Sequence, residues 1–241
     1  MTTMPEMTTA QEASWHALLD LADRFPTGWT LIGGQLVQLH CAERGVRPIR
    51  PTLDADAALD VRREPQIFTS FTEHLESMGF KADRETTGGK QHRWVRGDAM
   101  VDVLIPTGLG RGAGTKSASG MPGLETDGVQ FALNRTDLVE ITVGDRTGLI
   151  PRPTLIGALI IKAAAWGNTL DALRERHISD FATLASLLAT RDLRDADLSK
   201  NERAYLRQAI KDASGYARLG EVAGGADGLN RLSRVVDPQS Q

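Results

Sequence analysis

Two carboxylates one residue apart are the side chains of this sequence best placed to do chemistry. Asp54 and Asp56 belong to the apolar run 53–61, and in a β-strand residues i and i+2 point to the same face. Adjacent carboxylates repel each other unless a cation lies between them. Hard oxygen ligands on one face suit Mg²⁺, which binds one or two carboxylates together with substrate phosphates. The pair therefore predicts a metal site for a phosphate-bearing substrate.

A glycine pair, Gly33 and Gly34, precedes the carboxylates and stands between the short apolar run 30–32 and a helical pattern over 35–44. The N-terminus of a helix presents free backbone N–H groups to a phosphate, and glycine allows the phosphate to come close. The glycine pair and the carboxylates together indicate a site that holds a nucleoside triphosphate (NTP) through a metal ion.

A third carboxylate, Asp102, lies in the apolar run 100–104. An isolated carboxylate is costly to bury, so either Asp102 faces water on an edge strand or it joins Asp54 and Asp56 from a neighbouring strand. In the second case three carboxylates on two strands could hold two metal ions, one activating an attacking hydroxyl and one steadying the triphosphate leaving group. Asp102 could also serve as the general base.

Further charged residues stand in the second half of the chain. Lys162 lies in an apolar helical segment, where it either extends its ammonium group to the surface or makes a point-charge contact with a triphosphate. Asp180 could pair with Lys162 and hold it in place, or position the substrate. His177 could carry a proton, or it could be a surface or capping group. His40 could reach the nucleotide from the helix after Gly34, although a packed histidine is the alternative.

Composition limits the class of protein. The chain has 241 residues, a formal net charge of −3 and one cysteine, Cys41, which excludes an internal disulfide framework and fits a reducing cytoplasm. No apolar stretch is long enough to span a membrane, and the N-terminal residues do not form a signal peptide. Neither half is basic enough to be a nucleic-acid binder by composition alone. A group of arginines near the glycine and carboxylate motifs is either a solvated surface or a positive rim that steers a polyanion: Arg44, Arg47, Arg50, Arg62 and Arg63.

These residues need a scaffold, and the periodicity of apolar residues predicts its elements. The expected helices cover residues 11–25, 35–44, 66–78, 154–166, 170–189 and 199–215, and the expected strands cover residues 30–32, 53–61, 91–95, 99–105, 129–133 and 138–143. This order predicts an α+β fold, α/β-like in its first half, with a mixed sheet flanked by helices. We expect a catalytic domain over 11–150, a helical C-terminal domain over 151–222, and flexible tails over 1–10 and 223–241.

The glycine-rich segment 107–128 interrupts this pattern. Its composition predicts a loop without regular structure. A loop of this length is either a mobile surface segment or a functional one, and because it follows the strand that carries Asp102 it could close over a substrate.

The ordered motifs resemble a known pattern. Gly33-Gly34, Thr52-x-Asp54-x-Asp56 and a later Asp102 resemble the nucleotidyltransferase fold of the DNA polymerase β superfamily. The further motifs are similar to those of AbiEii-type nucleotidyltransferase toxins of bacterial type IV toxin–antitoxin systems: Arg50-x-Thr52, Lys162, and Arg176-His177-x-x-Asp180. The resemblance spans roughly residues 28 to 190.

The resemblance implies transfer of a nucleoside monophosphate (NMP) from an NTP to an acceptor hydroxyl with two Mg²⁺ ions, or Mn²⁺ in their place. For some toxins the acceptor is the 3′ end of tRNA, and the cognate antitoxin is the expected protein partner. By this likeness Gly33, Gly34 and Thr52 contact phosphates, Asp54, Asp56 and Asp102 hold metal, and Lys162 and Asp180 complete the site. Two alternatives remain open: adenylylation of a protein or a small molecule, and a non-catalytic module that binds a nucleotide or an antitoxin.

Overall fold

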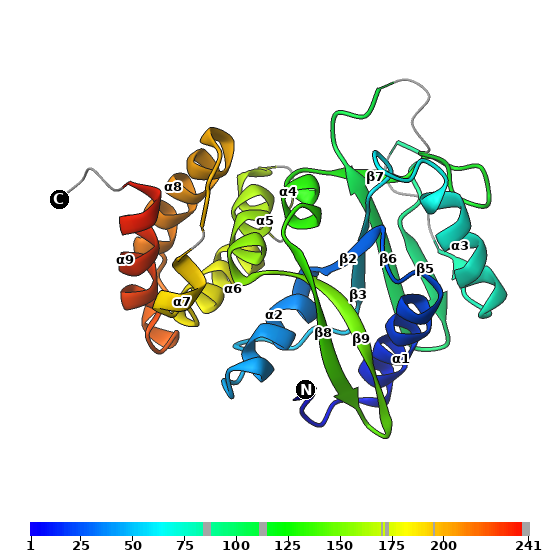
Figure 1. The fold of residues 1–241 in the computed structure, drawn as a ribbon, viewed down its shortest axis with the longest axis horizontal. Coiled ribbons are helices and arrows are strands. Elements are labelled where there is room, and N and C mark those ends of the chain that lie inside the picture. The colour runs from blue at the N-terminus through cyan, green and yellow to red at the C-terminus, as the bar shows by residue number, and fades with distance from the viewer. Residues whose placement is uncertain (84–87, 111–114, 170, 172–173, 195, 238–241) are drawn as a thin grey trace.

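A mixed β-sheet forms the centre of the first half of the chain (Figure 1). The computed structural model describes residues 1–83, 88–110, 115–169, 171, 174–194 and 196–237. The sheet has the strand order β2-β3-β6-β5-β4, with β7 beside the end of β6. Its strands are β2 (Trp29–Ile32), β3 (Ala55–Leu59), β6 (Ala99–Pro106), β5 (Arg93–Arg96), β4 (Lys81–Ala82) and β7 (Leu124–Thr126). The contact between β3 and β6 is parallel, whereas β2–β3 and β5–β6 are antiparallel, so the expected mixed sheet is confirmed.

A second sheet pairs β8 (Thr136–Val143) with β9 (Arg146–Pro153) and with the short β1 (Thr2–Thr3). Met4, which follows β1, is 6% exposed. Residues 1–10 were expected to be a flexible tail, but they begin with this paired strand and end in the first turn of helix α1.

Four helices accompany the sheets in the described part of the first half: α1 (Thr9–Arg24), α2 (Gly33–Glu43), α3 (Ile67–Ser77) and α4 (Val129–Leu133). Helix α1 starts with a capping box between Thr8 and Gln11 and buries Trp15 and Leu18 against the core. Helix α2 begins directly where β2 ends. This direct connection places the N-terminus of α2 at the edge where the strand finishes.

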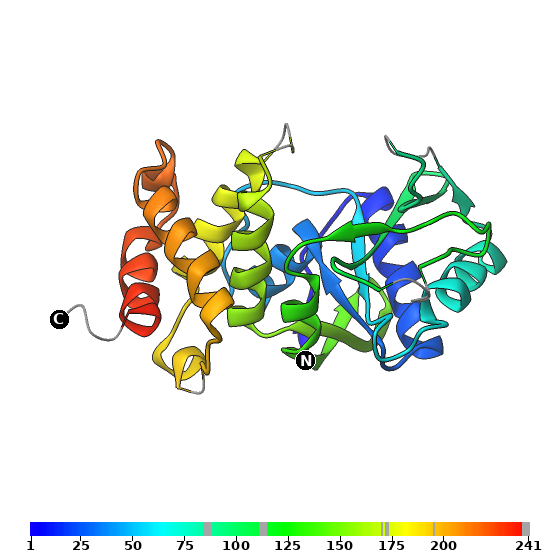
Figure 2. The same cartoon turned by 90° about the horizontal axis from the view of Figure 1, so that it is seen from above.

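The second half of the chain is helical and lies at one end of the molecule, with the C-terminus beyond it (Figures 1 and 2). Its elements are α5 (Leu155–Gly167), α6 (Glu175–Ser186), α7 (Thr190–Leu193), α8 (Lys200–Ser214), the 3₁₀ turn η1 (Leu219–Glu221) and α9 (Gly225–Val236). Thr154 caps α5, and Ser199 with Glu202 forms the capping box of α8, as the sequence predicts. Residues 170 and 172–173 of the expected helix 170–189 lie outside the described residues.

The strand expected over residues 129–133 is instead helix α4. The run is too short for its periodicity to distinguish a strand from a helix. Gly128, at φ +81°, turns the chain into the helix, and a Cβ at this glycine would lie 2.7 Å from Cβ of Ala164. The close approach to α5 therefore fixes a helical turn that the local sequence does not specify.

Strand β9 was not among the expected strands, and Pro151 and Pro153 lie within it. Proline is tolerated on edge strands, where no neighbour needs its missing N–H group, and β9 is an edge strand of its sheet. The boundary expected near residue 150 therefore falls inside this strand.

Helix α9 corrects the expectation of a flexible tail over residues 223–241. Leu229 and Leu232 of α9 are buried, and a Cβ on Gly228 would lie 2.0 Å from the carbonyl oxygen of Ala185 in α6. Residues 238–241 of the expected tail lie outside the described residues. Within the part of the chain that is described, no helix is long and apolar enough to cross a membrane.

Candidate active site

The three carboxylates singled out in the sequence meet on two neighbouring strands. Asp56 of β3 lies opposite Asp102 of β6 in the parallel register, and Asp54 directly precedes β3. Each of the three offers a ligand atom, and these atoms lie within 4.8 Å of one another. The alternative in which Asp102 faces water from an edge strand does not apply, because Asp102 is 6% exposed and β6 lies between β3 and β5.

Gly33 and Gly34 leave the space into which this cluster packs. Gly33 has φ +71°, and a Cβ on it would lie 1.8 Å from Oδ2 of Asp56. A Cβ on Gly34 would lie 2.6 Å from Oγ1 of Thr52. The glycine pair therefore has a role beyond phosphate approach, since it lets the carboxylate strand lie against the start of α2.

Thr52 orients the first carboxylate. Its Oγ1 donates a hydrogen bond of 2.7 Å to Oδ1 of Asp54, and its carbonyl oxygen accepts a hydrogen bond of 2.7 Å from Nε2 of Gln11 in α1. The contact with Gln11 is buried, and Thr52 itself is buried. The backbone before β3 is thereby anchored to α1, and the Asp54 carboxylate has a defined direction.

The electrostatics of the cluster fit a divalent cation. Burial, and then the neighbouring charges of Asp102 and Asp54, raise the pKa of Asp56 to about 7. Such a carboxylate ionises more readily when positive charge comes close. Three oxygen donors at this separation match the ligand preference of Mg²⁺ or Mn²⁺, so the residues fit the metal that the sequence predicts.

Lys162 does not extend to the surface. Its Nζ donates a hydrogen bond of 2.7 Å to Oδ2 of Asp180 in α6, and both side chains are 4% exposed. Arg50 donates to the same carboxylate through Nε at 2.9 Å and through Nη2 at 2.7 Å. Burial alone would raise the pKa of Asp180, but Lys162 and Arg50 lower it below its ordinary value. Asp180 thus joins the segment before β3 to two helices of the second half.

A second polar cluster lies beside this ion pair. Nε2 of His177 is 3.0 Å from Oδ2 of Asp171, and Nη2 of Arg176 is 3.3 Å from the same oxygen. Burial, and then the charge of Lys162, lower the pKa of His177 to about 4. His177 is therefore neutral at physiological pH, with its position fixed by Asp171.

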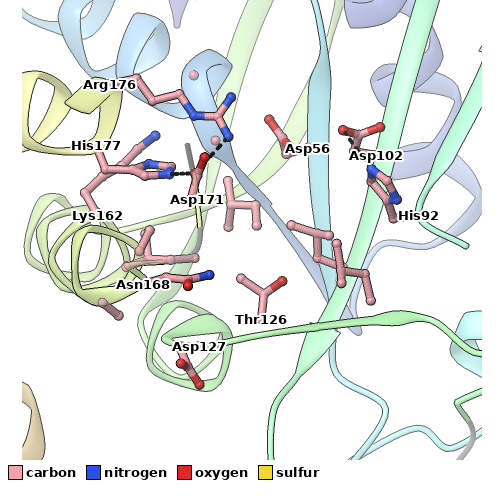
Figure 3. A pocket seen from close by; sticks show the side chains of 18 of the residues that line it. Asp56, His92, Asp102, Thr126, Asp127, Lys162, Asn168, Asp171, Arg176 and His177 are labelled. Atoms are coloured by element: carbon pink, nitrogen blue, oxygen red, sulfur yellow. Dashed lines mark hydrogen bonds and ion pairs between the residues drawn. The ribbon is translucent and has the colours of Figure 1, made fainter. Parts of the chain in front are cut away.

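These groups surround one cavity of about 420 Å³. Figure 3 shows Asp56 and Asp102 on one side of it and Lys162, His177 and Arg176 on the other, with Thr126 and Asp127 along a third side. The other predicted site residues Gly33, Gly34, Thr52 and Asp54 also line the cavity, whereas Asp180 lies behind Lys162. Residues 124–127 of the expected irregular segment 107–128 line it too, partly as strand β7, while residues 111–114 lie outside the described residues.

His40 and Arg44 do not line this cavity, whereas Arg50 does. His40 is 1% exposed, with Nε2 3.1 Å from the carbonyl oxygen of Pro153 and Nδ1 3.1 Å from Oε2 of Glu43, so it is a packed histidine. The arginines that could form a positive rim do not all face solvent as free charges. Arg44 pairs with Asp192 at 2.9 Å, and Arg50 pairs with Asp180. Two of the five arginines are therefore engaged in ion pairs within the molecule.

Sequence reasoning missed Arg93. Its Nε and Nη2 donate to Oδ1 and Oδ2 of Asp102 at 2.8 and 2.7 Å, and Nη2 lies 3.4 Å from Oδ2 of Asp54. The hairpin turn at Gly97 offers a signal that could have found it. Counting back along both strands from that turn pairs Arg96 with Ala99 and Arg93 with Asp102, and opposed residues share one face.

Comparison with known proteins supports the fold. No model of a known protein family matches this sequence, and no curated protein matches it. Among solved structures, the crystal structure of an antigenic nucleotidyltransferase-like protein from Paracoccidioides brasiliensis is 13% identical, with a TM-score of 0.51 over 90% of this chain and 95% of that one.

Two structures of the antibiotic-resistance factor ANT(2'')-Ia are also similar. The solution structure is 14% identical, with a TM-score of 0.47 over 87% of this chain and 97% of that one. The crystal structure in complex with adenylyl-2''-tobramycin is 14% identical, with a TM-score of 0.39 over 97% of this chain and 100% of that one. At such low identity the likeness to the Paracoccidioides brasiliensis protein establishes the fold alone. The chain has the mixed sheet and flanking helices of the nucleotidyltransferase fold.

Proposed function

We propose that this protein is a metal-dependent nucleotidyltransferase, which transfers NMP from an NTP to an acceptor hydroxyl and releases pyrophosphate. One observation carries the proposal. Asp54, Asp56 and Asp102 converge within 4.8 Å at the wall of a cavity that also contains the N-terminus of α2. Carboxylates for metal and free helix N–H groups for phosphate are the parts that phosphoryl transfer needs.

In this reaction the acceptor oxygen forms a bond to the α-phosphorus while the bond from that phosphorus to the pyrophosphate oxygen breaks. Asp54, Asp56 and Asp102 would hold the metal, which when bound supplies positive charge to the hydroxyl and the phosphates. Asp102 lies innermost on the sheet and would accept the hydroxyl proton. Thr52 keeps Asp54 directed at the cluster through its 2.7 Å hydrogen bond.

The opposite wall of the cavity supplies fixed positive charge. Lys162 and Arg176 both act on Asp56 electrostatically, since each lowers its pKa. Asp180 and Asp171 hold these two cations in place. We propose that Lys162 contacts the triphosphate from this position, and that the first turn of α2 at Gly33 and Gly34 binds it from the other side.

The finer assignments follow from the motif resemblance. We propose the 3′ end of tRNA as the acceptor, and a toxin role with a cognate antitoxin as partner. Adenylylation of a protein or of a small molecule uses the same site with another hydroxyl. The acceptor is therefore the part of the proposal that needs a direct test.

The test is incubation of the purified protein with each radiolabelled NTP and Mn²⁺ or Mg²⁺, together with total RNA, lysate protein or an aminoglycoside. Label on RNA alone supports the tRNA assignment, and label only on protein or only on the aminoglycoside replaces it. The matched variants are Asp56→Asn in the cluster and Asp98→Asn in the exposed turn between β5 and β6. We expect Asp56→Asn to abolish labelling and Asp98→Asn to leave it unchanged. Tight NTP binding with no transfer to any acceptor would overturn the enzymatic assignment.

A further inference from the structure

A row of three charged side chains crosses the sheet beside the cavity. Asp56 of β3 lies opposite Asp102 of β6, and Asp102 lies opposite Arg93 of β5. Neighbouring strands are about 4.8 Å apart, and opposed residues share a face. The sheet register therefore places Arg93 next to Asp102, on the face of the sheet that carries Asp56.

The ion pair between Arg93 and Asp102 is bidentate. Both oxygens of Asp102 accept hydrogen bonds from the guanidinium, at 2.8 and 2.7 Å. This fork geometry is specific to arginine and gives both direction and strength to the pair. The Asp102 side chain is 8% exposed, whereas Arg93 is 31% exposed, so Arg93 approaches the buried carboxylate from the solvent side.

The contact between Arg93 and Asp54 is weaker. Nη2 lies 3.4 Å from Oδ2 of Asp54, at the limit of a hydrogen bond. A carboxylate has about four lone-pair sites, so Asp102 can keep its two bonds to Arg93 and still offer an oxygen to another cation. Asp54 can exchange its long contact for a shorter one at little cost.

We propose that Arg93 is a built-in counter-cation of the carboxylate cluster, which holds Asp102 in place and competes with the divalent cation for the charge of Asp54 and Asp102. The inference rests on the proposed function, because the cation is the one that the transfer reaction needs. Its consequence is that the cluster binds the cation weakly on its own. Substrate phosphates add negative charge and further oxygen ligands, so cation loading becomes dependent on NTP.

The electrostatic argument sets the direction of the effect. A guanidinium carries one positive charge, and a divalent cation bound to the same carboxylates would lie close to it in a partly buried site, where like charges repel more strongly than in water. Removing the charge of Arg93 therefore favours the cation. Removing it also takes away the cation that is hydrogen-bonded to Asp102, while the three carboxylates stay close together, which destabilises the cation-free protein.

The experiment measures Mn²⁺ binding by titration calorimetry or electron paramagnetic resonance without NTP, so that it does not depend on activity. We expect Arg93→Gln to bind Mn²⁺ about tenfold more tightly than the wild type. Arg93→Lys keeps the charge and loses the fork, so its Mn²⁺ affinity should stay near that of the wild type. Arg96→Gln is the matched control, because it removes the same charge from the exposed end of β5, where Arg96 contacts the carbonyl oxygen of Met78.

A second measurement covers the case in which Arg93→Gln folds poorly. Its thermal midpoint in EDTA should lie below that of the wild type, and saturating Mn²⁺ should raise it by more than it raises the wild-type midpoint. Equal or weaker Mn²⁺ binding by Arg93→Gln, or a midpoint that Mn²⁺ fails to restore, overturns the counter-cation role.

The two proposals fail in different ways. Wild-type protein that binds Mn²⁺ but transfers no nucleotide rejects the function and leaves the role of Arg93 standing on the binding data. Transfer activity combined with unchanged Mn²⁺ affinity in Arg93→Gln rejects the role of Arg93 alone.

Discussion

Gly33 and Asp56 are packed against each other so closely that a Cβ on the glycine would lie 1.8 Å from Oδ2 of the carboxylate. Gly33 is the first residue of α2, and Asp56 lies on β3. Ile32, which precedes Gly33, is in register with Asp56 across the antiparallel strands β2 and β3. The start of the helix and the carboxylate cluster therefore form one packed unit. A change in either part must displace the other.

Replacement of Gly33 by alanine tests this unit. The new methyl group would displace the Asp56 carboxylate from its present position in the cluster, and a displacement of about 1 Å in an active site costs roughly 100-fold in rate. Gly45→Ala is the control, because Gly45 has a similar φ of +66° but nothing within 4 Å of its Cβ position. Transfer assays and Mn²⁺ titrations of both variants should show a loss only for Gly33→Ala. Equal losses in the two variants would assign the effect to backbone strain instead.

The buried carboxylate of Asp180 should matter more to stability than either of its partners. Asp180→Asn leaves the buried Lys162 ammonium without its counter-charge, and such a break costs about 3 to 5 kcal/mol. Lys162→Met should cost less, because Arg50 still pairs with Asp180. Urea unfolding of the two variants checks this order. Glu221→Gln, which breaks the exposed pair with Arg218, should not change the unfolding midpoint, and a larger loss for Lys162→Met than for Asp180→Asn would contradict the arrangement.

His177 should make stability depend on pH in the acid range. Its folded-state pKa of about 4 lies below the ordinary value of 6.5. As pH falls from the higher value to the lower, the unfolded chain binds a proton that the folded chain does not, so the free energy of unfolding falls. At pH values above 6.5, the ordinary pKa of histidine, the contribution of neutral His177 to the free energy of unfolding is fully present.

Comparison of the wild type with His177→Gln isolates the pH-dependent contribution of His177 to stability. We expect the wild type to lose about 2 kcal/mol more than the variant between about pH 7.5 and about pH 5. His74→Gln on α3 is the matched control and should follow the wild type. Parallel pH profiles for the wild type and His177→Gln would show that the burial of this histidine makes no contribution.

Helix α9 should contribute to the stability of the helical half. Leu232 is 0% exposed, and truncation of a buried leucine to alanine costs about 2 to 5 kcal/mol. Arg234→Ala, on the exposed face of the same helix, should have little effect. Urea unfolding measures both variants. If Leu232→Ala were as stable as Arg234→Ala, the C-terminal segment would behave as the flexible tail that its composition suggests.

Much of the candidate site was predictable because its parts are local. The face shared by Asp54 and Asp56 follows from the two-residue period of a strand, and the start of α2 at Gly33 follows from the switch between two periodicities. The caps at Thr154 and Ser199 depend on side chains at most three residues from the groups that they satisfy. Each of these features uses residues close together in the chain.

Errors arose where distant contacts override local preference. The segment 129–133 is a helix because Gly128 must fit against α5, and β9 is a strand despite its prolines because it lies at a sheet edge. The segment after residue 223 is helical because α6 and α8 bury one of its faces. A short or polar segment has too weak a preference of its own to decide its structure.

The sequence by itself determined the chemical groups, their local faces and the α+β class of this protein. Only the tertiary structure decided that Asp102 lies beside Asp56, because a parallel strand pair requires a long crossover whose register cannot be counted along the chain. Tertiary packing also buried Lys162 against Asp180 and brought Arg93 to 3.4 Å from Asp54. Burial and the distance between charges are properties of the folded chain, and they decide which cations the carboxylate cluster can hold.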